Sequence, residues 1–235
     1  MVEKIIKELQ GFGDPVRAKH SLRYFKTGPG EYGEGDRFIG VKAADVHRLA
    51  RKYHDISVRD MLSLLRSPIH ESRQLALLIF VHKFARGNEK EHEMLFRLYL
   101  KNTKWINGWD LVDCSAGLIA GEYLLDKDTG ILDRLAKSKS LWERRIAMIA
   151  TSAFIKQKRF EIAFRIAEQL LNDEEDLIHK AAGWMLREVG KRDQAAEEKF
   201  LKKHHRTMPR TMLRYAIEKF PEPLRQAYLA KKKGA

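Results

Sequence analysis

The sequence predicts an all-α protein, arranged as a curved solenoid of antiparallel helix pairs. Apolar residues recur at spacings of three and four along most of the 235 residues, which is the period of an α-helix. Only six prolines occur, and they stand where helices are expected to begin or end. Because no segment alternates apolar and polar residues with a period of two, we expect no β-strands.

The individual helices follow from the apolar positions and the prolines. Pro15, Pro68 and Pro209 predict helix starts, because proline suits the first turn of a helix. Pro221 and Pro223 are expected to close the helix that ends near residue 220. The apolar spacings place helices within residues 2–9, 41–53, 75–84, 95–100, 111–124, 146–155, 162–170, 181–189 and 213–220.

One segment cannot be a regular helix. Residues 27–40 read TGPGEYGEGDRFIG and hold five of the fifteen glycines. Glycine at this density predicts an exposed loop between two helices. No strand is expected before it and it lacks a GK[ST] ending, so it does not fit a phosphate-binding P-loop.

A repeat organises most of the chain. Similar helices begin near Arg73, Trp109, Arg145, Lys180 and Arg214, so successive starts are 34 to 36 residues apart. Such a period holds two helices and their links, and the pairs must stack to bury their apolar faces. We therefore expect one domain over residues 1–235, with N-terminal helices in 1–66 and repeats in 67–230. Its concave face is the expected binding surface.

Composition narrows the class of protein. Apolar residues make up 44% of the chain, which excludes a wholly disordered protein. The surplus of 45 Lys and Arg over 32 Asp and Glu gives a net charge of +13 and predicts a polyanionic ligand, such as DNA, RNA or an acidic membrane surface. A single cysteine excludes a disulfide framework and a cysteine-based zinc site.

The sequence predicts neither a secretory signal nor a membrane-spanning segment. Charged residues interrupt the apolar pattern of the first ten residues, so we expect no secretory signal. No run of about 18 apolar residues occurs, so we expect no transmembrane helix. These features predict a soluble, intracellular protein.

The repeat helices carry unusual polar and aromatic residues near their starts. Trp109 and Asp113 are four residues apart and therefore share a helix face. The Asp113 carboxylate either is paired inside the protein, for example with Arg145, or faces a cleft. Asp110 either shares the cleft with Asp113 or, as favoured here, is a solvent-facing or capping residue near the helix start. Glu188 is expected to pair with a basic neighbour.

Further arginines and tryptophans are candidates either for the concave binding face or for the core. Arg144 and Arg145 either line the concave face or form an exposed pair with Glu143. Trp105 and Trp142 are expected in the core. The concave face is further expected to include Trp184, Arg187, Arg210 and Arg214. The basic runs 202–206, with Lys202 and Lys203, and 231–233 are expected to be solvated surface that adds positive charge for a phosphate backbone.

Metal and thiol chemistry is not expected. The nine histidines form no HExxH or other tight ligand set, so we predict no metal site and no cofactor. Cys114 is expected to be a buried small side chain, because nothing near it in the sequence would lower its pKa.

The same residues carry a family resemblance. The segments WDLVD at 109–113, LWERR at 141–145, KAAGWMLRE at 180–188 and PRTMLRYAIEKF at 209–220, with LRYFK at 22–26 and FIGV at 38–41, resemble the DNA alkylation repair family. These AlkD-like proteins are bacterial and archaeal alkylpurine DNA glycosylases built from HEAT-like helical repeats. The resemblance covers nearly the whole chain.

The resemblance implies roles for matching positions. Asp113 matches the catalytic aspartate, and Trp109 and Trp184 match DNA-contacting tryptophans. Arg145 matches the arginine of the catalytic cleft and is expected to hold a phosphate, while Arg187 and Tyr24 match further cleft residues. In two places the chain departs from the family, because Gly108 stands where some members carry a second tryptophan and the glycine-rich loop at 28–36 is longer than in some members.

A mechanism accompanies this resemblance. An N7- or N3-alkylated purine is already cationic and leaves without protonation, so a carboxylate is needed only to stabilise the sugar cation and to orient or deprotonate the water. The expected partner is double-stranded DNA containing alkylated purines. We expect a monomer without an obligate protein partner, in the cytoplasm at the nucleoid. The alternative is a non-catalytic HEAT-like module that binds DNA, RNA or protein, which would not require a carboxylate at position 113.

Overall fold

The computed structural model describes residues 1–230 and confirms the all-α fold class. Within those residues the chain forms helices and no strand, with one isolated bridge between Arg37 and Ile69. It divides into two compact units, Met1–Tyr123 and Leu124–Ala235. In the described part, no helix is both long and apolar enough to cross a membrane.

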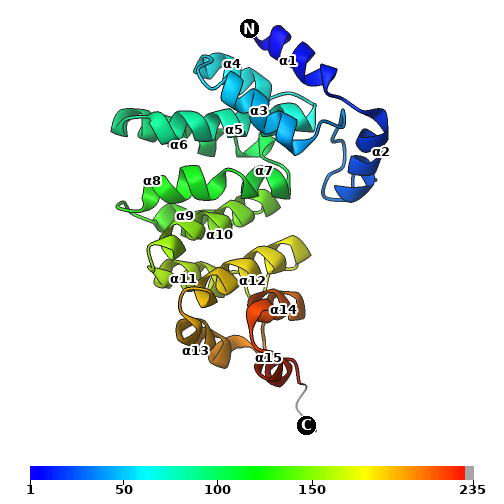
Figure 1. Ribbon diagram of the computed structural model, residues 1–235. Helices are drawn as coiled ribbons and strands as arrows, with labels where there is room; N and C mark the ends of the chain where they lie inside the picture. The colour runs from blue at the N-terminus through cyan, green and yellow to red at the C-terminus, as the bar shows by residue number, and fades with distance from the viewer. Residues whose placement is uncertain (231–235) are drawn as a thin grey trace. The chain divides into compact units, whose positions relative to one another are not determined.

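The first unit is built around one long helix. Helix α5 (His70–Arg86) packs on α3 (Ala43–Lys52), α4 (Val58–Leu65), α6 (Glu89–Lys101) and α7 (Trp109–Asp113), as Figure 1 shows. Ten of its side chains between positions 70 and 80 are buried, so α5 has no wholly polar face in this half. Helix α1 (Val2–Gly11) packs on α4, and α2 (Pro15–Tyr24) leads into the glycine-rich loop.

The second unit repeats a short–long helix pair. Helices α9 (Gly130–Ala136) and α10 (Leu141–Lys156) form one pair, and α11 (Phe160–Gln169) and α12 (Asp176–Gly190) form the next. Helix α12 also packs on α10, on α13 (Gln194–His204) and on α14 (Arg210–Ala216), and α15 (Glu222–Leu229) follows. Successive long helices therefore stack on one another, as the repeat predicts.

A glycine permits the closest of these contacts. A Cβ atom at Gly183 of α12 would lie 2.4 Å from the carbonyl oxygen of Met212 and 2.5 Å from the Cβ of Tyr215, both on α14. Any side chain at position 183 would therefore push the two helices apart. The glycine beside Trp184 is explained by this packing.

The helix starts agree with the sequence to within a few residues. The five repeat helices were expected near residues 73, 109, 145, 180 and 214, and the helices α5, α7, α10, α12 and α14 begin at residues 70, 109, 141, 176 and 210. Asp14 caps α2 as Pro15 predicts, since its side chain accepts from the backbone amides of Val16 and Arg17.

The other prolines also lie at helix boundaries, with shifts of one or two residues. After Pro68 the helix begins two residues later, at His70, and Pro209 itself is the N-cap of α14. The helical segment before Pro221 ends at residue 219, as predicted, and Pro221 is also the N-cap of α15. One helix prediction was wrong. The helix predicted over 111–124 is interrupted, since α7 ends at Asp113 and a π-helical turn (Gly117–Gly121) precedes the short α8 (Glu122–Leu124).

The expected burial of two tryptophans was wrong, whereas the expected domain organisation stays a prediction. Trp105 and Trp142, expected in the core, are only half-buried. The single domain with N-terminal helices in 1–66 and repeats in 67–230 stays a prediction, as does the concave basic cleft. The lysines at 231–233 lie outside the described residues.

Candidate functional site

Helix α7 carries two of the candidate residues. It begins at Trp109, directly after Gly108, and ends at Asp113. Leu111 and Val112 are fully buried, and they anchor the helix in the first unit. Trp109 and Asp113 are both half-buried, so their side chains lie at the margin of the core.

Aromatic side chains from the end of α2 surround Trp109. Tyr24 meets the indole edge to face with ring centroids 5.8 Å apart, and Phe25 stacks on it at 5.4 Å with an interplanar angle of 17°. Tyr24 is 66% exposed, so this aromatic surface is accessible from outside the protein. The structure thus brings together Tyr24 and Trp109, which are 85 residues apart in the chain.

Behind this surface lies a buried network of charged groups. The Nε2 of His70 lies 2.8 Å from Oδ2 of Asp110, and its Nδ1 lies 2.7 Å from Oδ2 of Asp36. The side chains of His70, Asp36 and Asp110 are 2%, 7% and 13% exposed. Arg73 donates to the other oxygen of Asp36. Two cationic side chains therefore meet two carboxylates.

The network shifts the pKa values of its members. Burial alone would lower the pKa of His70, but the hydrogen bonds to Asp110 and Asp36, together with their negative charges, raise it to about 9. Burial alone would raise the pKa of Asp36, but the hydrogen bond from His70 and the charge of Arg73 outweigh it, and the pKa is lowered. The expectation that Asp110 is solvent-facing or a helix cap was wrong, because its carboxylate binds His70.

The glycine-rich loop is exposed in its first part and anchored in its second. The carboxylate of Glu71 is buried and accepts from the backbone amides of Ile39, Gly40 and Val41, with the shortest distance 2.7 Å at Gly40. Gly40 has a φ of +78°, and a Cβ there would lie 2.1 Å from the carbonyl oxygen of Asp14. The end of the loop is therefore fixed against the first turn of α5.

In the second unit the arginines of α10 are engaged inside the protein. Arg145 is only 4% exposed and donates to the carbonyl oxygen of Leu177 at 2.5 Å. Arg144 donates to both carboxylate oxygens of Asp173, at 2.6 and 3.3 Å. The alternative of an exposed arginine pair was wrong. The contacts of these two side chains with DNA stay predictions.

Trp184 of α12 belongs to a polar cluster. Its indole N–H donates to Glu188 at 3.3 Å, and Glu188 also binds Lys191 and Arg192, as expected of a carboxylate with basic neighbours. Burial alone would raise the pKa of Glu188, but these hydrogen bonds lower it. Arg187 is paired with Glu218 of the turn after α14.

The remaining basic candidates lie at the surface. Lys202 and Lys203 are exposed, and Lys203 pairs with Glu168 at 2.7 Å. Arg210 donates to the carbonyl oxygen of Leu229, whereas exposed Arg214 has no carboxylate partner among residues 1–230. Arg214 is therefore the most available of these cations.

The described residues can be examined for a metal-binding cluster and for a reactive thiol. Residues 1–230 contain no group of three or more His, Cys, Asp or Glu placed to hold a metal ion. Burial, aided by the charges of Asp110 and Asp113, raises the pKa of Cys114, which disfavours a thiolate nucleophile there.

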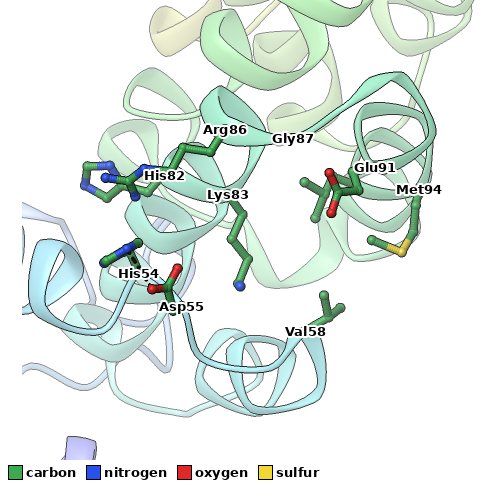
Figure 2. Close-up of a pocket in the computed structure, with 10 residues that line it drawn as sticks. His54, Asp55, Val58, His82, Lys83, Arg86, Gly87, Glu91 and Met94 are labelled. Atoms are coloured by element: carbon green, nitrogen blue, oxygen red, sulfur yellow. Dashed lines mark ion pairs between the residues drawn. The ribbon is translucent and has the colours of Figure 1, made fainter.

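A pocket of about 190 Å³ lies elsewhere in the first unit (Figure 2). The Lys83 ammonium group points into it, and His82, Arg86 and the ion-paired His54 and Asp55 stand beside it. His82 and Arg86 belong to the last turns of α5, about 18–24 Å along the helix from its first residue, at 1.5 Å per residue. The pocket is therefore separate from the aromatic surface, and no residue predicted from the sequence lines it.

Several residues of the site around Trp109 were not predicted from the sequence. They are Phe25, Asp36, Phe38, His70, Glu71 and Arg73. Phe25 lies within the segment LRYFK, and the charged run at 70–73 precedes an apolar helix. Neither pattern indicates which loop will pack against that helix.

Comparison with known proteins identifies a family and a fold. The family model described as DNA alkylation repair enzyme matches residues 5–220. A solved structure of a predicted DNA alkylation repair enzyme from Enterococcus faecalis is similar with a TM-score of 0.70 and 17% sequence identity, covering 89% of this chain and 97% of that one. No curated protein matches the chain. At that identity the structural likeness shows a shared fold alone.

Proposed function

The chain belongs to the DNA alkylation repair enzyme family, and from this premise we propose that it is a monofunctional DNA glycosylase acting on cationic alkylated purines. Its substrates are 7-methylguanine and 3-methyladenine in double-stranded DNA, and the reaction is hydrolysis of the N-glycosidic bond. The protein acts as a monomer, without a cofactor, in the cytoplasm at the nucleoid. The observation that carries the proposal is the half-buried carboxylate of Asp113 on the helix that presents Trp109 beside exposed Tyr24.

The chemistry follows from the charge of the lesion. An N7- or N3-alkylated purine bears a positive charge and departs as a neutral base, so the leaving group needs no proton. The sugar approaches an oxocarbenium ion, which a nearby carboxylate stabilises. The same carboxylate orients the attacking water and accepts the proton that the water loses as the bond to the sugar carbon forms. We assign this role to Asp113.

The aromatic surface suits a cationic nucleotide. Tryptophan and tyrosine faces attract cations through their π electrons and offer apolar area to a sugar. Trp109 and Tyr24 are the residues we assign to this contact in the first unit. In the second unit we assign DNA contacts to Trp184 and Arg214, while Arg144, Arg145, Arg187, Arg210, Lys202 and Lys203 remain proposed contributors of positive charge.

Replacing the carboxylate tests the assignment of the reaction. Asp113→Asn removes the negative charge and keeps the shape, so the single-turnover release of 7-methylguanine from duplex DNA should fall by about a hundredfold or more. The dissociation constant for DNA should stay within about threefold, because the lost interaction exists only in the transition state. Free base is measured by chromatography.

Asp126→Asn is the control, because the side chain of Asp126 is 98% exposed and Asp126 is not among the residues assigned to the site. Its excision rate should equal that of the wild-type protein. Unchanged excision by Asp113→Asn would remove Asp113 from the mechanism. Binding of DNA by a wild-type protein that releases no base would instead favour a non-catalytic binding module.

The choice of lesion gives a second test. A neutral adduct such as 1,N6-ethenoadenine leaves poorly unless an acid protonates it. Asp110, the nearest second carboxylate on α7, is bound by His70 and by Gln74 and is not available to donate a proton. Release of 7-methylguanine should therefore be measurable at pH 7 and release of ethenoadenine should not. Comparable rates for both would show that another group acts as a general acid.

A further inference from the structure

The candidate site depends on a helix that is too short to be stable, or to keep a fixed orientation, without contacts to the rest of the protein. Helix α7 has five residues, and an isolated helix of that length is unstable in water. Leu111 and Val112 fix one face of it in the core. The rotation of Trp109 and Asp113 about the helix axis must be fixed by something more directional than apolar packing.

The side chain of Asp110 supplies a directional contact at the start of α7. Its Oδ2 lies 2.8 Å from Nε2 of His70, and the pair is almost fully excluded from water. Gly108 makes room for it, since a Cβ at that position would lie 3.0 Å from both Oδ1 of Asp110 and Cε1 of His70. The absence of a side chain at position 108 is thus matched to the His70–Asp110 contact.

The orientation of His70 is itself fixed on every side. Its ring stacks on Phe38 with centroids 4.5 Å apart and lies 5.0 Å from the ring of Phe25. Each ring nitrogen faces a carboxylate oxygen, and an ionised carboxylate only accepts hydrogen bonds, so both nitrogens must carry a proton. A doubly protonated imidazole bound at both ends cannot rotate without breaking a buried ionic hydrogen bond.

The far end of the contact reaches the glycine-rich loop. Asp36 binds both His70 and Arg73, and the backbone amide of His70 donates to the carbonyl oxygen of Arg37 at 2.8 Å. The loop in turn carries Phe38 onto Phe25, at a centroid distance of 4.9 Å, and Phe25 stacks on Trp109. Polar and aromatic contacts therefore join the loop, α5 and α7 in one network.

We propose that His70 is a positioning residue of the DNA site, whose two ring N–H groups bind Asp110 and Asp36 and so fix Trp109 and Asp113 against the aromatic side chains of α2. The inference rests on the proposed function, in which α7 carries the reactive carboxylate. With 2% exposure His70 does not touch DNA, and its effect passes through α7. It also assigns a role to the glycine-rich loop, which supplies one of the two carboxylates.

The position of Trp109 can be followed without any assay of activity. The chain has four tryptophans, so 5-fluorotryptophan labelling gives few fluorine resonances, and Trp109→Phe assigns one of them. In His70→Gln, which cannot donate to both carboxylates, the Trp109 resonance should shift or broaden. The Trp184 resonance should not move. In His82→Gln, a matched change near the other end of α5, neither should move.

The protonation of His70 can be followed in the same samples. Nitrogen-15 spectra of the imidazole should show both ring nitrogens protonated at pH 7, with a midpoint near pH 9 in the wild-type protein. Asp110→Asn keeps an acceptor oxygen but removes a charge, so it should lower this midpoint and move the Trp109 resonance. This second variant serves if His70→Gln fails to fold.

Kinetics separate positioning from folding. His70→Gln should lose about tenfold or more in the single-turnover release of 7-methylguanine, because a small misplacement of a reacting group is costly, while DNA affinity changes little. His82→Gln should match the wild-type rate. An unmoved Trp109 resonance in both His70→Gln and Asp110→Asn would overturn the inference, as would a moved resonance with an unchanged excision rate. A wild-type protein that releases no base would overturn the proposed function, and the fluorine spectra would then decide the positioning role alone.

Discussion

Glu197 on α13 is a carboxylic acid in an unfavourable place. It is 1% exposed, and its Oε1 has no hydrogen-bond partner among residues 1–230. Burial and the charge of neighbouring Glu198 raise its pKa to about 9, although the charge of Arg187 acts in the opposite direction. The folded protein therefore keeps this group protonated at neutral pH, whereas the unfolded chain ionises it.

The free energy of unfolding should consequently depend on pH through Glu197. Because the folded-state pKa is raised, its contribution to stability is complete below about pH 4.5 and is lost as the pH rises towards 9. Glu197→Gln removes this loss and should be more stable than wild type by about 4 kcal/mol at pH 8, with little difference at pH 4.5.

Urea denaturation at the two pH values measures the effect. Glu161→Gln, an exposed glutamate of α11, is the control and should leave the difference between the two pH values unchanged. A variant Glu197→Gln that follows the wild-type pH dependence would mean that Glu197 is ionised in the folded protein.

Single residues also mark the limit of prediction from sequence. Trp109, Asp113 and Tyr24 were predicted to share a site, and Trp109 does contact Tyr24. His70 and Asp36 were not predicted, because their pairing depends on the path of a loop 34 residues away. Arg145 was expected to hold a phosphate, but the sequence gives no measure of its burial, which is set by α12 packing on α10.

At the scale of elements, Gly183 tests whether the close contact between α12 and α14 determines stability. Gly183→Ala gains about 1 kcal/mol of helix propensity but forces a Cβ to within 2.4 Å of a backbone carbonyl oxygen. Overpacking of this kind costs about 1–3 kcal/mol or more, so the variant should be destabilised. Gly11→Ala is the control, because nothing lies within 4 Å of its Cβ, and it should be neutral or slightly stabilising. Equal melting temperatures for the two variants would show that the helices separate at no cost.

Helix positions were predicted better than helix continuity. Apolar spacing located the starts of the repeat helices because each must turn one face to its neighbours. The same spacing wrongly predicted one continuous helix over residues 111–124, although α7 ends at Asp113. A π-helical turn takes up an extra residue, and a count of apolar positions does not detect it. That break places the end of α7, and with it Asp113, at the margin of the core.

At the scale of the whole molecule, the count of 45 Lys and Arg overstates the cations available to a ligand, whereas the net charge of +13 already subtracts the 32 Asp and Glu. Arg144, Arg187 and Lys203 are paired with carboxylates within the second unit. Ion pairs of this kind cancel much of each cation's field at a distance. The formal charge predicted a polyanionic partner, but it could not predict which cations remain unpaired, because the pairs join residues about 30 positions apart.

Salt dependence of DNA binding measures this available charge. Each cation that neutralises a phosphate releases counterions, so the logarithm of the association constant should fall with the logarithm of salt concentration, with a slope of about −0.9 per contact. Arg214 is exposed and has no carboxylate partner in the described chain, so Arg214→Ala should reduce the slope by about one contact. Arg97→Ala should leave the slope unchanged, because the exposed guanidinium of Arg97 is bound by Glu93 at 2.6 Å.

Fluorescence anisotropy of a labelled duplex at several salt concentrations gives the slopes for the wild-type protein and for the two variants. A dissociation constant independent of salt would contradict phosphate binding altogether, whereas equal losses in both variants would mean that pairing inside the protein does not decide which cations meet DNA.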